Sequence, residues 1–309
     1  MSAPAAVTAF APATVANLGP GFDVLGLALQ GPGDTVTARR VRGSGVRLVK
    51  VEGDHGRLPR DAANTATIAA EATLRRAGVE AGVELELIKG LPLGSGLGSS
   101  AASAAAAAFA VNLLVGSPLR KVELVEPCLA AEGAVSGRHA DNVAPALLGG
   151  LILVRSVDPL DVIRLPLPEG LSVVVTTPAM ELSTREARAA LPDAVQLRAL
   201  VANTANIAAL VAACHSGDLG LLARSLSDAV VTPARARLIP GCEAVFAAAL
   251  DAGALGSSIS GAGPSIFALC RSAHSAAEVA AAMVAAFKGA GLASGAIVSP
   301  ADCPGARRL

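Results

Sequence analysis

The sequence predicts a two-domain α+β protein, and three observations support this fold class. First, 309 residues exceed the usual size of a single domain, so two domains are the favoured division. Second, short segments with alternating apolar and polar residues, typical of strands, are interspersed with longer apolar runs that are typical of helices. Third, Pro159, Pro166 and Pro168 interrupt this pattern near the middle of the chain. We therefore predict domains at residues 1–165 and 166–309.

The overall composition argues against several classes of protein. The 25 basic and 25 acidic residues give a formal net charge of zero, so there is no broad positive field to attract nucleic acid or an anionic membrane. Aromatic residues make up only 2%, without Trp or Tyr, which removes the stacking surfaces that single-stranded nucleic-acid binders use. The five cysteines form no CxxC pair, which argues against a zinc site or a disulfide framework and favours a reducing cytoplasm. We expect a cytoplasmic protein with small-molecule partners and no binding to nucleic acid or membranes.

The first half of the chain is predicted to alternate strands and helices. Strands are predicted at residues 7–10, 35–41, 46–51, 83–89 and 147–154. Helices are predicted at residues 64–76, 101–115 and 121–131. The segment Arg42–Gly45 is typical of a turn, so the two strands beside it are predicted to pair as a hairpin. The second helix is Ala-rich and is predicted to be buried, because it is shorter than the run of about 18 strongly apolar residues that a membrane span needs.

The second half shows a similar alternation. Strands are predicted at residues 171–176, 265–270 and 296–299, and helices at residues 197–216 and 276–288. Residues 181–191 lead into the first of these helices. We therefore predict a βαβ-like arrangement for this half.

A glycine-rich loop that leads into the Ala-rich helix is the first candidate for chemistry. Gly94, Gly96 and Gly98 alternate along the loop, and Ser99 and Ser100 follow at the start of the helix. Glycines let the backbone adopt positive φ and approach a ligand, while a helix N-terminus offers unpaired N–H groups and positive partial charge to a phosphate. The alternative is a flexible turn into a buried helix that the two serines cap. The loop is neither a Walker A motif, because no Lys follows the glycines, nor a Rossmann turn, because a serine occupies the third glycine position.

The loop sequence PLGSGLGSS, residues 92–100, resembles the phosphate loop of the GHMP kinase family, small-molecule kinases named for galactose, homoserine, mevalonate and phosphomevalonate. The resemblance continues in PATVANLGPGFDVLGLAL at residues 12–29, HADNVAP at 139–145, STREAR at 183–188, PARARLIPG at 233–241 and GSSISGAGPSIFAL at 256–269. The string at residues 12–29 is similar to the N-terminal signature of the members that phosphorylate homoserine.

This resemblance implies both a fold and an activity. The implied fold is GHMP-kinase-like, with an N-terminal domain like domain 2 of ribosomal protein S5, a C-terminal ferredoxin-like domain and an active site in the cleft between them. The implied activity is ATP-dependent phosphorylation of the side-chain hydroxyl of L-homoserine to O-phospho-L-homoserine, on the pathway to threonine. The resemblance also implies a homodimer.

The residues that bind ATP and Mg²⁺ follow from the same resemblance. ATP is expected to contact Asn64, Lys89, Pro92, Leu93, Gly94, Ser95, Gly96, Leu97, Gly98, Ser99, Ser100 and Thr184. Mg²⁺ is expected to be held by Ser100 and Glu132. The implied catalytic residues are Ser99, Ser100, Glu132 and Asn142. Two residues have simpler interpretations, because Asn64 can cap the helix that follows it and Lys89 can be a solvated surface residue.

The residues that bind the amino acid follow from charge chemistry together with the resemblance. An ammonium group is matched by a carboxylate, for which Asp23 is the candidate, and a carboxylate by guanidinium groups, for which Arg188 and Arg235 are the candidates. The resemblance selects these two arginines over their neighbours Arg185 and Arg237. The full set of implied substrate contacts is Asn17, Asp23, His139, Asn142, Arg188, Arg235 and Gly261. The alternatives are turn formation for the first Asn and Asp and solvation for the arginines.

Removal of the proton from the acceptor hydroxyl is a separate question. The resemblance places Asn142 at this hydroxyl, and a neutral amide can orient a hydroxyl but cannot accept its proton. A loose transition state needs little activation of the nucleophile, so we expect no carboxylate base, with the neighbouring Asp141 as the rival interpretation. Two other functions remain open: a GHMP kinase for another alcohol, of the mevalonate or shikimate type, and a non-catalytic small-molecule binder with the same fold.

Overall fold

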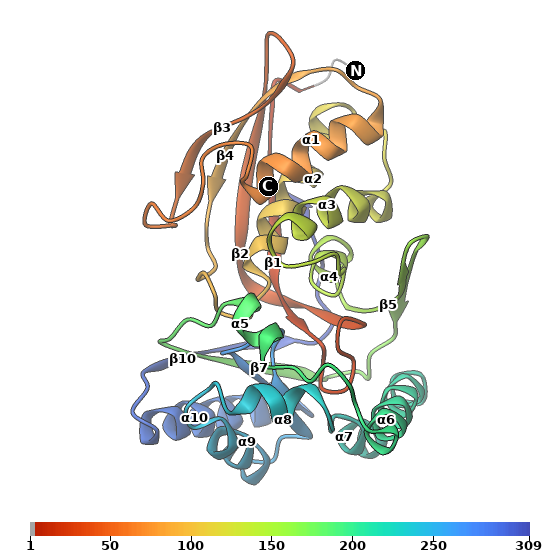
Figure 1. The fold of residues 1–309 in the computed structure, drawn as a ribbon, viewed down its shortest axis with the longest axis vertical. Helices are drawn as coiled ribbons and strands as arrows, with labels where there is room; N and C mark the ends of the chain where they lie inside the picture. Colours follow the sequence, from red (N-terminus) through yellow and green to blue (C-terminus); the bar gives the residue numbers. More distant parts are fainter. Residues whose placement is uncertain (1–3) are drawn as a thin grey trace.

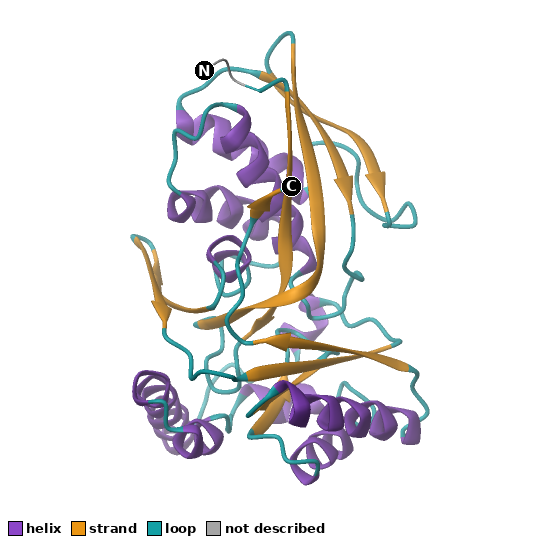
Figure 2. Cartoon of the chain, turned by 180° about the vertical axis from the view of Figure 1, so that it is seen from behind, coloured by secondary structure: helices purple, strands orange, loops and turns teal. Residues whose placement is uncertain are grey.

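Two β-sheets, one above the other in Figure 1, organise the chain in the computed structural model, which describes residues 4–309. The first sheet contains β1 (Ala6–Ala16), β2 (Leu25–Val41), β3 (Gly45–Glu52), β4 (Gly82–Ile88), β5 (Leu151–Val157), β6 (Leu160–Leu165) and β11 (Arg307–Arg308). The helices α1 (Thr65–Ala77), α2 (Ser99–Leu114), α3 (Val125–Val135) and α4 (Val143–Leu148), with the short 3-10 helix η1 (Lys121–Leu124), belong to the same half of the molecule. Figures 1 and 2 show these helices together on one side of the long strands.

The second sheet has the topology of a ferredoxin-like domain. Its strands are β7 (Ser172–Pro178), β8 (Gly256–Ile259), β9 (Ile266–Cys270) and β10 (Ser294–Pro300), in the order β10-β7-β9-β8 with all neighbours antiparallel. The helices of this half are α5 (Thr184–Ala189), α6 (Leu197–Ser216), α7 (Leu219–Ser225), α8 (Val231–Ala236), α9 (Cys242–Asp251) and α10 (Ala273–Gly289). The first five connect β7 to β8, and α10 connects β9 to β10, which is a βαββαβ arrangement. The predicted α+β class is therefore confirmed.

The predicted hairpin across Arg42–Gly45 is wrong. The two strands that flank this turn, β2 and β3, do not pair, because β4 lies between them, antiparallel to β2 and parallel to β3. β4 is the more apolar strand, and burying its alternate residues Val83, Leu85 and Leu87 requires a central place in the sheet. Gly82 lets β4 begin directly below the turn, since a Cβ at this position would lie 2.8 Å from the carbonyl oxygen of Val41.

One predicted strand boundary is also wrong, and the structure shows where the three prolines near the predicted domain boundary lie. Residues 147 and 148 belong to α4, and the strand begins only at Leu151, after Gly149 and Gly150 adopt positive φ and end the helix. Pro159 lies between β5 and β6, within the first sheet, whereas Pro166 and Pro168 lie in the connection from β6 to the second sheet. The division at residues 165 and 166 stays a prediction, and β11 returns to the first sheet by pairing with β1.

The Ala-rich helix α2 is buried, as predicted. Each alanine from Ala104 to Ala108 is fully buried, and the helix packs against α1, β1 and β2. Small side chains allow this close approach on several faces of the helix at once. The N-terminus of α2 is thereby held at a defined place beside β1.

Candidate active site

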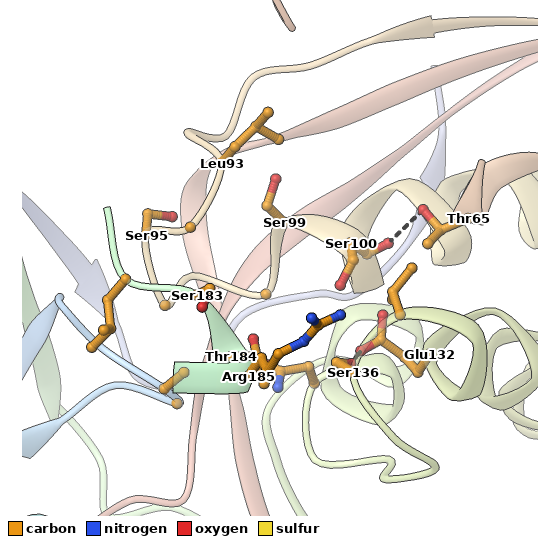
Figure 3. Close-up of a pocket in the computed structure, with 18 of the residues that line it drawn as sticks. Thr65, Leu93, Ser95, Ser99, Ser100, Glu132, Ser136, Ser183, Thr184 and Arg185 are labelled. Carbon is orange, nitrogen blue, oxygen red and sulfur yellow. Dashed lines mark hydrogen bonds between the residues drawn. The ribbon is translucent and has the colours of Figure 1, made fainter. Parts of the chain in front are cut away.

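A cavity of about 800 Å³ collects the polar residues that the sequence singled out. Its wall is formed by the glycine loop and the start of α2, the end of α3, the segment before α4, the α5 segment, and residues near β8 and β9. Figure 3 shows the part of the wall around the loop. Of the predicted site residues, the wall includes Asn17, Asp23, Asn64, Lys89, Leu93, Gly94, Ser95, Gly96, Gly98, Ser99, Ser100, Glu132, His139, Asn142, Thr184, Arg188, Arg235 and Gly261. Segments far apart in the chain therefore meet here, and the role of each residue remains a prediction.

Two of the predicted ATP contacts, Pro92 and Leu97, are outside the cavity wall. Pro92 is exposed, and its carbonyl oxygen accepts a hydrogen bond from Ser95 Oγ at 2.9 Å. The side chain of Leu97 is buried in an apolar cluster with Leu18 and Leu91, because it is an apolar residue on the inner side of the loop. Both residues shape the loop, and neither presents a side chain to the cavity.

The glycine loop approaches the second half of the chain too closely for side chains. At Gly96, where φ is +76°, a Cβ would lie 2.6 Å from the carbonyl oxygen of Ser260. Ser260 Oγ donates to the Gly96 carbonyl at 2.7 Å, and Ser265 Oγ donates to the Ser95 carbonyl at 2.6 Å. The loop is thus fastened to the β8–β9 region, a link that no local pattern in the sequence indicated.

The two serines do not cap α2, so the alternative interpretation of the loop as a turn capped by these serines is wrong. Gly98 occupies the N-cap position with φ of +67° and provides no side-chain cap, while Ser99 and Ser100 are the first two helical residues. The first amides of this helix are therefore not satisfied by a capping side chain. They are the groups that bind a phosphate at a helix N-terminus.

Lys89 lies in the cavity wall, but its side chain is almost completely buried. The side chain is only 1% exposed and forms an ion pair with Asp34. Its ammonium also donates to the Ser99 carbonyl and to Ser103 Oγ, both at 2.9 Å. Burial lowers the pKa of Lys89, and the charge and hydrogen bond of Asp34 oppose this shift. The alternative of a solvated surface lysine is therefore wrong, and the expected contact with ATP stays a prediction. The ammonium supports the first turn of α2, and its partner Asp34 is fully buried.

Asn64 caps α1 and lines the cavity at the same time. Its side-chain oxygen accepts a hydrogen bond from the Ala66 amide at 2.9 Å, and its Nδ2 donates to the Pro59 carbonyl at 2.8 Å. The capping interpretation is therefore confirmed, and the contact of Asn64 with ATP stays a prediction.

Glu132 is a buried carboxylate with an unused oxygen. It lies in the last turn of α3, where Oε2 accepts a hydrogen bond from Ser136 Oγ at 2.9 Å. Oε1 has no hydrogen-bond partner within residues 4–309. Burial raises the pKa of Glu132, and the neighbouring hydroxyls of Ser100 and Ser136 act in the opposite direction. Figure 3 shows Glu132 and Ser136 at the end of α3 facing Ser100 on α2.

Asp23, Arg188 and Arg235 lie together on the wall, around Phe22. Arg188 Nη2 donates to both oxygens of Asp23, at 2.8 and 3.1 Å, while Arg188 Nε is buried without a partner in the described part of the chain. Arg235 Nη1 donates to the Gly261 carbonyl at 2.7 Å. Both guanidinium carbons lie about 5 Å from the centre of the Phe22 ring, at 5.3 and 5.1 Å. Burial, together with the charge of Arg188, lowers the pKa of Arg235 to about 10, so its guanidinium is still charged at neutral pH.

Asn17 fixes the turn that carries Asp23. Its Oδ1 accepts a hydrogen bond from the Asp23 amide at 3.1 Å, and its Nδ2 donates to the Gly261 carbonyl at 3.0 Å. Both residues have positive φ, 74° for Asn17 and 58° for Asp23, which Asn and Asp tolerate better than other side chains. The turn-forming interpretation is therefore correct, and it places both residues on the wall.

His139 and Asp141 form an ion pair beside this cluster. His139 Nδ1 lies 3.2 Å from Asp141 Oδ1. Burial by itself would lower the pKa of His139, but the hydrogen bond and charge of Asp141 and the charge of Asp23 outweigh it and raise the pKa to about 9. At neutral pH the imidazole is therefore protonated and compensates the buried Asp141 carboxylate.

Several residues at the site were not found from the sequence. Thr14, Asp34 and Phe22 lie in strand-like or apolar segments, and nothing in their local pattern separates them from core positions. Arg57, between β3 and α1, donates paired hydrogen bonds of 2.5 and 2.7 Å to Glu181, between β7 and α5, and both residues line the wall. Because each of these contacts joins distant segments, only the folded chain shows them.

Comparisons with known proteins agree with this geometry. Residues 64–150 match the GHMP kinases N terminal domain and residues 209–289 match the GHMP kinases C terminal domain. The fold and the site therefore define a small-molecule kinase of the GHMP class. The chain is 49% identical to homoserine kinase of Arabidopsis thaliana over 97% of this chain and 84% of that protein, and 44% identical to that of Xanthomonas campestris over 97% and 93%. The crystal structure of homoserine kinase from Cytophaga hutchinsonii superposes with a TM-score of 0.97 at 46% identity, covering 100% of this chain and 99% of that one.

The chain belongs to the homoserine kinases. A mevalonate kinase from L. major shares the fold, with a TM-score of 0.68 at 18% identity over 94% of this chain and 95% of that one. At this level of identity the likeness concerns the fold alone.

Proposed function

We propose that this protein transfers the γ-phosphoryl group of ATP to the side-chain hydroxyl of L-homoserine, giving ADP and O-phospho-L-homoserine for threonine biosynthesis. The observation that carries this proposal is one cavity that joins an anion-binding helix N-terminus to a carboxylate and two guanidinium groups. The helix N-terminus suits the phosphates of ATP, and the charged cluster suits an amino acid with an ammonium and a carboxylate. Mevalonate has no ammonium group to match Asp23.

In the transfer step, a bond forms from the substrate oxygen to the γ-phosphorus. The bond from that phosphorus to the β–γ bridging oxygen breaks, and its electrons remain on ADP. The hydroxyl proton passes late to a phosphoryl oxygen, because a loose transition state needs little activation of the nucleophile. Asn142, in the cavity wall beside Gly98, orients the hydroxyl, and the Asp141 carboxylate is already engaged with His139.

The donor set at Glu132 fits a magnesium ion. Mg²⁺ prefers oxygen ligands, and the orphaned, buried Oε1 of Glu132 near the Ser100 hydroxyl is such a donor. We therefore assign Glu132 and Ser100 as the residues that would hold the ion. When bound, Mg²⁺ supplies positive charge that offsets the charge developing on the transferring phosphoryl group. Ser136 orients the carboxylate through its hydrogen bond to Oε2.

A nucleotide-turnover assay across several alcohols tests the substrate. With Mg-ATP, L-homoserine should release ADP at least about tenfold faster than mevalonate, shikimate or galactose at equal concentration, since each charge-assisted hydrogen bond contributes roughly 1.5–3 kcal/mol. Equal or faster turnover of mevalonate would identify another GHMP kinase. ATP binding without turnover of any alcohol would identify a non-catalytic binder.

Replacing Arg188 or Arg235 should weaken use of homoserine. Arg188→Ala and Arg235→Ala are each expected to lower kcat/KM for homoserine roughly tenfold or more, which corresponds to about 1.4 kcal/mol. Replacement by Lys should also impair the enzyme, because an ammonium does not reproduce the planar fork of a guanidinium. Steady-state kinetics at saturating ATP measure both effects.

Arg237 provides the matched control for these variants. It is exposed, lies two residues from Arg235, and donates to the Ala190 carbonyl at 3.2 Å outside the cavity wall. Arg185 was also expected to face away from the substrate, yet it lines the wall, so it is a weaker control. Equal losses in Arg237→Ala and in the two test variants would contradict the assignment.

Replacing Asp141 tests the absence of a carboxylate base. Asp141→Asn is expected to keep kcat within about tenfold, less than the 10²–10⁴ that a general base contributes. The pKa of His139 should fall below its value of about 9, because Asp141 is the main group that raises it. An NMR titration of His139 shows that the contact was lost, and a thousandfold fall in kcat with the fold intact would make Asp141 the base.

We also propose that the protein is a cytoplasmic homodimer that pairs through α6. This helix is apolar and largely uncovered, with Leu197 74% and Val201 60% exposed, and such a stripe is unusual on a free surface. The length and composition of α6 would allow a membrane span, but one such helix is weak support for that. Asn203 and Asn206, near the centre of the helix, also bond to Asp228 and to the Ser227 carbonyl.

The compartment and the assembly are proposed on separate grounds. The five free cysteines agree with a reducing compartment. Sedimentation should show a dimer that Val201→Asp dissociates, and a monomeric wild type would refute this assembly.

A further inference from the structure

Thr14 is a fully buried polar residue behind the cavity wall. It lies near the end of β1, is 0% exposed, and is not part of the wall. The pairing of β1 with β2 shifts register here, so that Pro12 pairs with Gly33 but Thr14 pairs with Ala28. Beyond the shift, the Thr14 amide donates to the Leu97 carbonyl in the glycine loop, at 3.1 Å. Register irregularities of this kind redirect strand residues next to active sites.

The Thr14 hydroxyl holds the side chain of Asn142. It donates to Asn142 Oδ1 at 2.7 Å, although 128 residues separate the two in sequence. Gly98 closes over the pair, since a Cβ at this position would lie 2.1 Å from Thr14 Oγ1 and 2.8 Å from Asn142 Oδ1. The pair is therefore enclosed between β1 and the N-cap of α2, which restricts rotation of the Asn142 amide.

Asn142 lies in the cavity wall, and with Oδ1 engaged by Thr14 its remaining polar group is Nδ2. An amide nitrogen of this kind donates two hydrogen bonds and accepts none. We propose that Thr14 is a positioning residue that holds Asn142 in this orientation, so that Nδ2 donates to the oxygen of the substrate hydroxyl. The hydroxyl proton then makes no bond to Asn142 and is free to pass to a phosphoryl oxygen. This inference rests on the kinase function proposed above.

Substitutions at Thr14 distinguish the effect of removing the hydroxyl from the effect of changing the shape of the side chain. Thr14→Val, which removes only the hydroxyl, is expected to lower kcat roughly 10- to 100-fold, the scale of loss that follows small misplacements at a reacting centre, with KM for ATP unchanged within about twofold. Thr14→Ser keeps the hydroxyl, and its kcat should stay within about threefold of the wild-type kcat. Thr8→Val is the matched control, because Thr8 lies on the same strand and bonds to Thr37 at 2.9 Å, away from the cavity. It should behave as wild type.

A double-mutant cycle tests whether the effect passes through Asn142. In the Asn142→Ala background, Thr14→Val should lower kcat no further, because the residue on which Thr14 acts is already absent. Effects that multiply would overturn the proposal, as would a wild-type kcat in Thr14→Val or equal losses in the Val and Ser variants. If Thr14→Val does not fold, as judged by thermal unfolding, Thr14→Ala takes its place in the cycle.

The cycle also separates this inference from the substrate assignment. If the wild type prefers another alcohol, the proposed substrate is wrong, and the same cycle run on that alcohol still tests the role of Thr14. If homoserine is the preferred substrate but the effects multiply, only the role of Thr14 is wrong.

Discussion

Glu132→Gln is expected to lower kcat by roughly 100-fold or more, the range seen when one group that stabilises transition-state charge is removed. Gln keeps the shape of Glu132 and its bond from Ser136, but it removes the negative charge that Oε1 would offer to Mg²⁺. Because this charge acts on the transition state, the loss should appear mainly in kcat, with a smaller change in homoserine binding. Added Mg²⁺ should restore activity only in part.

The same variant should be more stable than the wild type. Burial raises the folded-state pKa of Glu132 above its ordinary value of 4.5, so the ionised carboxylate destabilises the folded state at neutral pH. Below pH 4.5 both the folded and the unfolded protein carry a protonated Glu132, and the penalty is absent. This destabilisation grows as the pH rises from the pKa of Glu132 in the unfolded state to its pKa in the folded state, and it is constant above the folded-state pKa. The melting temperature of Glu132→Gln should therefore exceed that of the wild type at pH 8 and approach it at low pH.

Glu126→Gln is the matched control for this experiment. Glu126 is on the same helix, is partly exposed and pairs with Arg76 away from the cavity. It should change neither kcat nor the pH dependence of stability in this way. An unchanged kcat in Glu132→Gln at saturating ATP and Mg²⁺ would remove Glu132 from the reaction.

Breaking the buried ion pair between Lys89 and Asp34 should give the largest loss of stability. Lys89→Met and Asp34→Asn are each expected to lower the free energy of unfolding by about 3–5 kcal/mol, because each leaves the other group without its partner in the interior. The double variant should lose less than the sum of the two, since it leaves neither charge buried. Urea denaturation of the four proteins measures this coupling.

The Lys89→Met substitution should also weaken ATP binding. Its ammonium holds the Ser99 carbonyl, and Asp34 accepts hydrogen bonds from the Gly90 amide at 3.0 Å and from Ser103 Oγ at 2.6 Å. The pair therefore joins both ends of the glycine loop to the first sheet. Lys50→Met is the control, because Lys50 pairs with Glu52 on the exposed face of β3, where water screens the interaction. Equal stability losses in the Lys50 and Lys89 variants would contradict a special role for the buried pair.

The local sequence was sufficient for features that depend on neighbouring residues. The helix at 197–216 has the predicted bounds, and the Ala-rich helix is buried as its composition required. The glycines at 94, 96 and 98 adopt positive φ, as their alternation before a helix indicated. Most of the site residues that the motifs predicted lie on one cavity wall. The helix bounds and the positive φ angles depend on residues a few positions apart along the chain, whereas the meeting of the motifs at one wall depends on the whole fold.

Only the tertiary structure decided the contacts that join distant segments. The place of β4 between β2 and β3 follows from burying Leu85 and its neighbours, a demand of the whole sheet that overrides the turn beside it. From the sequence Lys89 could be an ATP contact or a solvated surface residue, and only its ion pair with Asp34, 55 positions away, shows that its side chain is buried in the interior. Thr14 and Asn142 are 128 positions apart. Such contacts depend on how complete sheets and helices pack against one another, and a pattern read along one strand or loop contains no information about its partner.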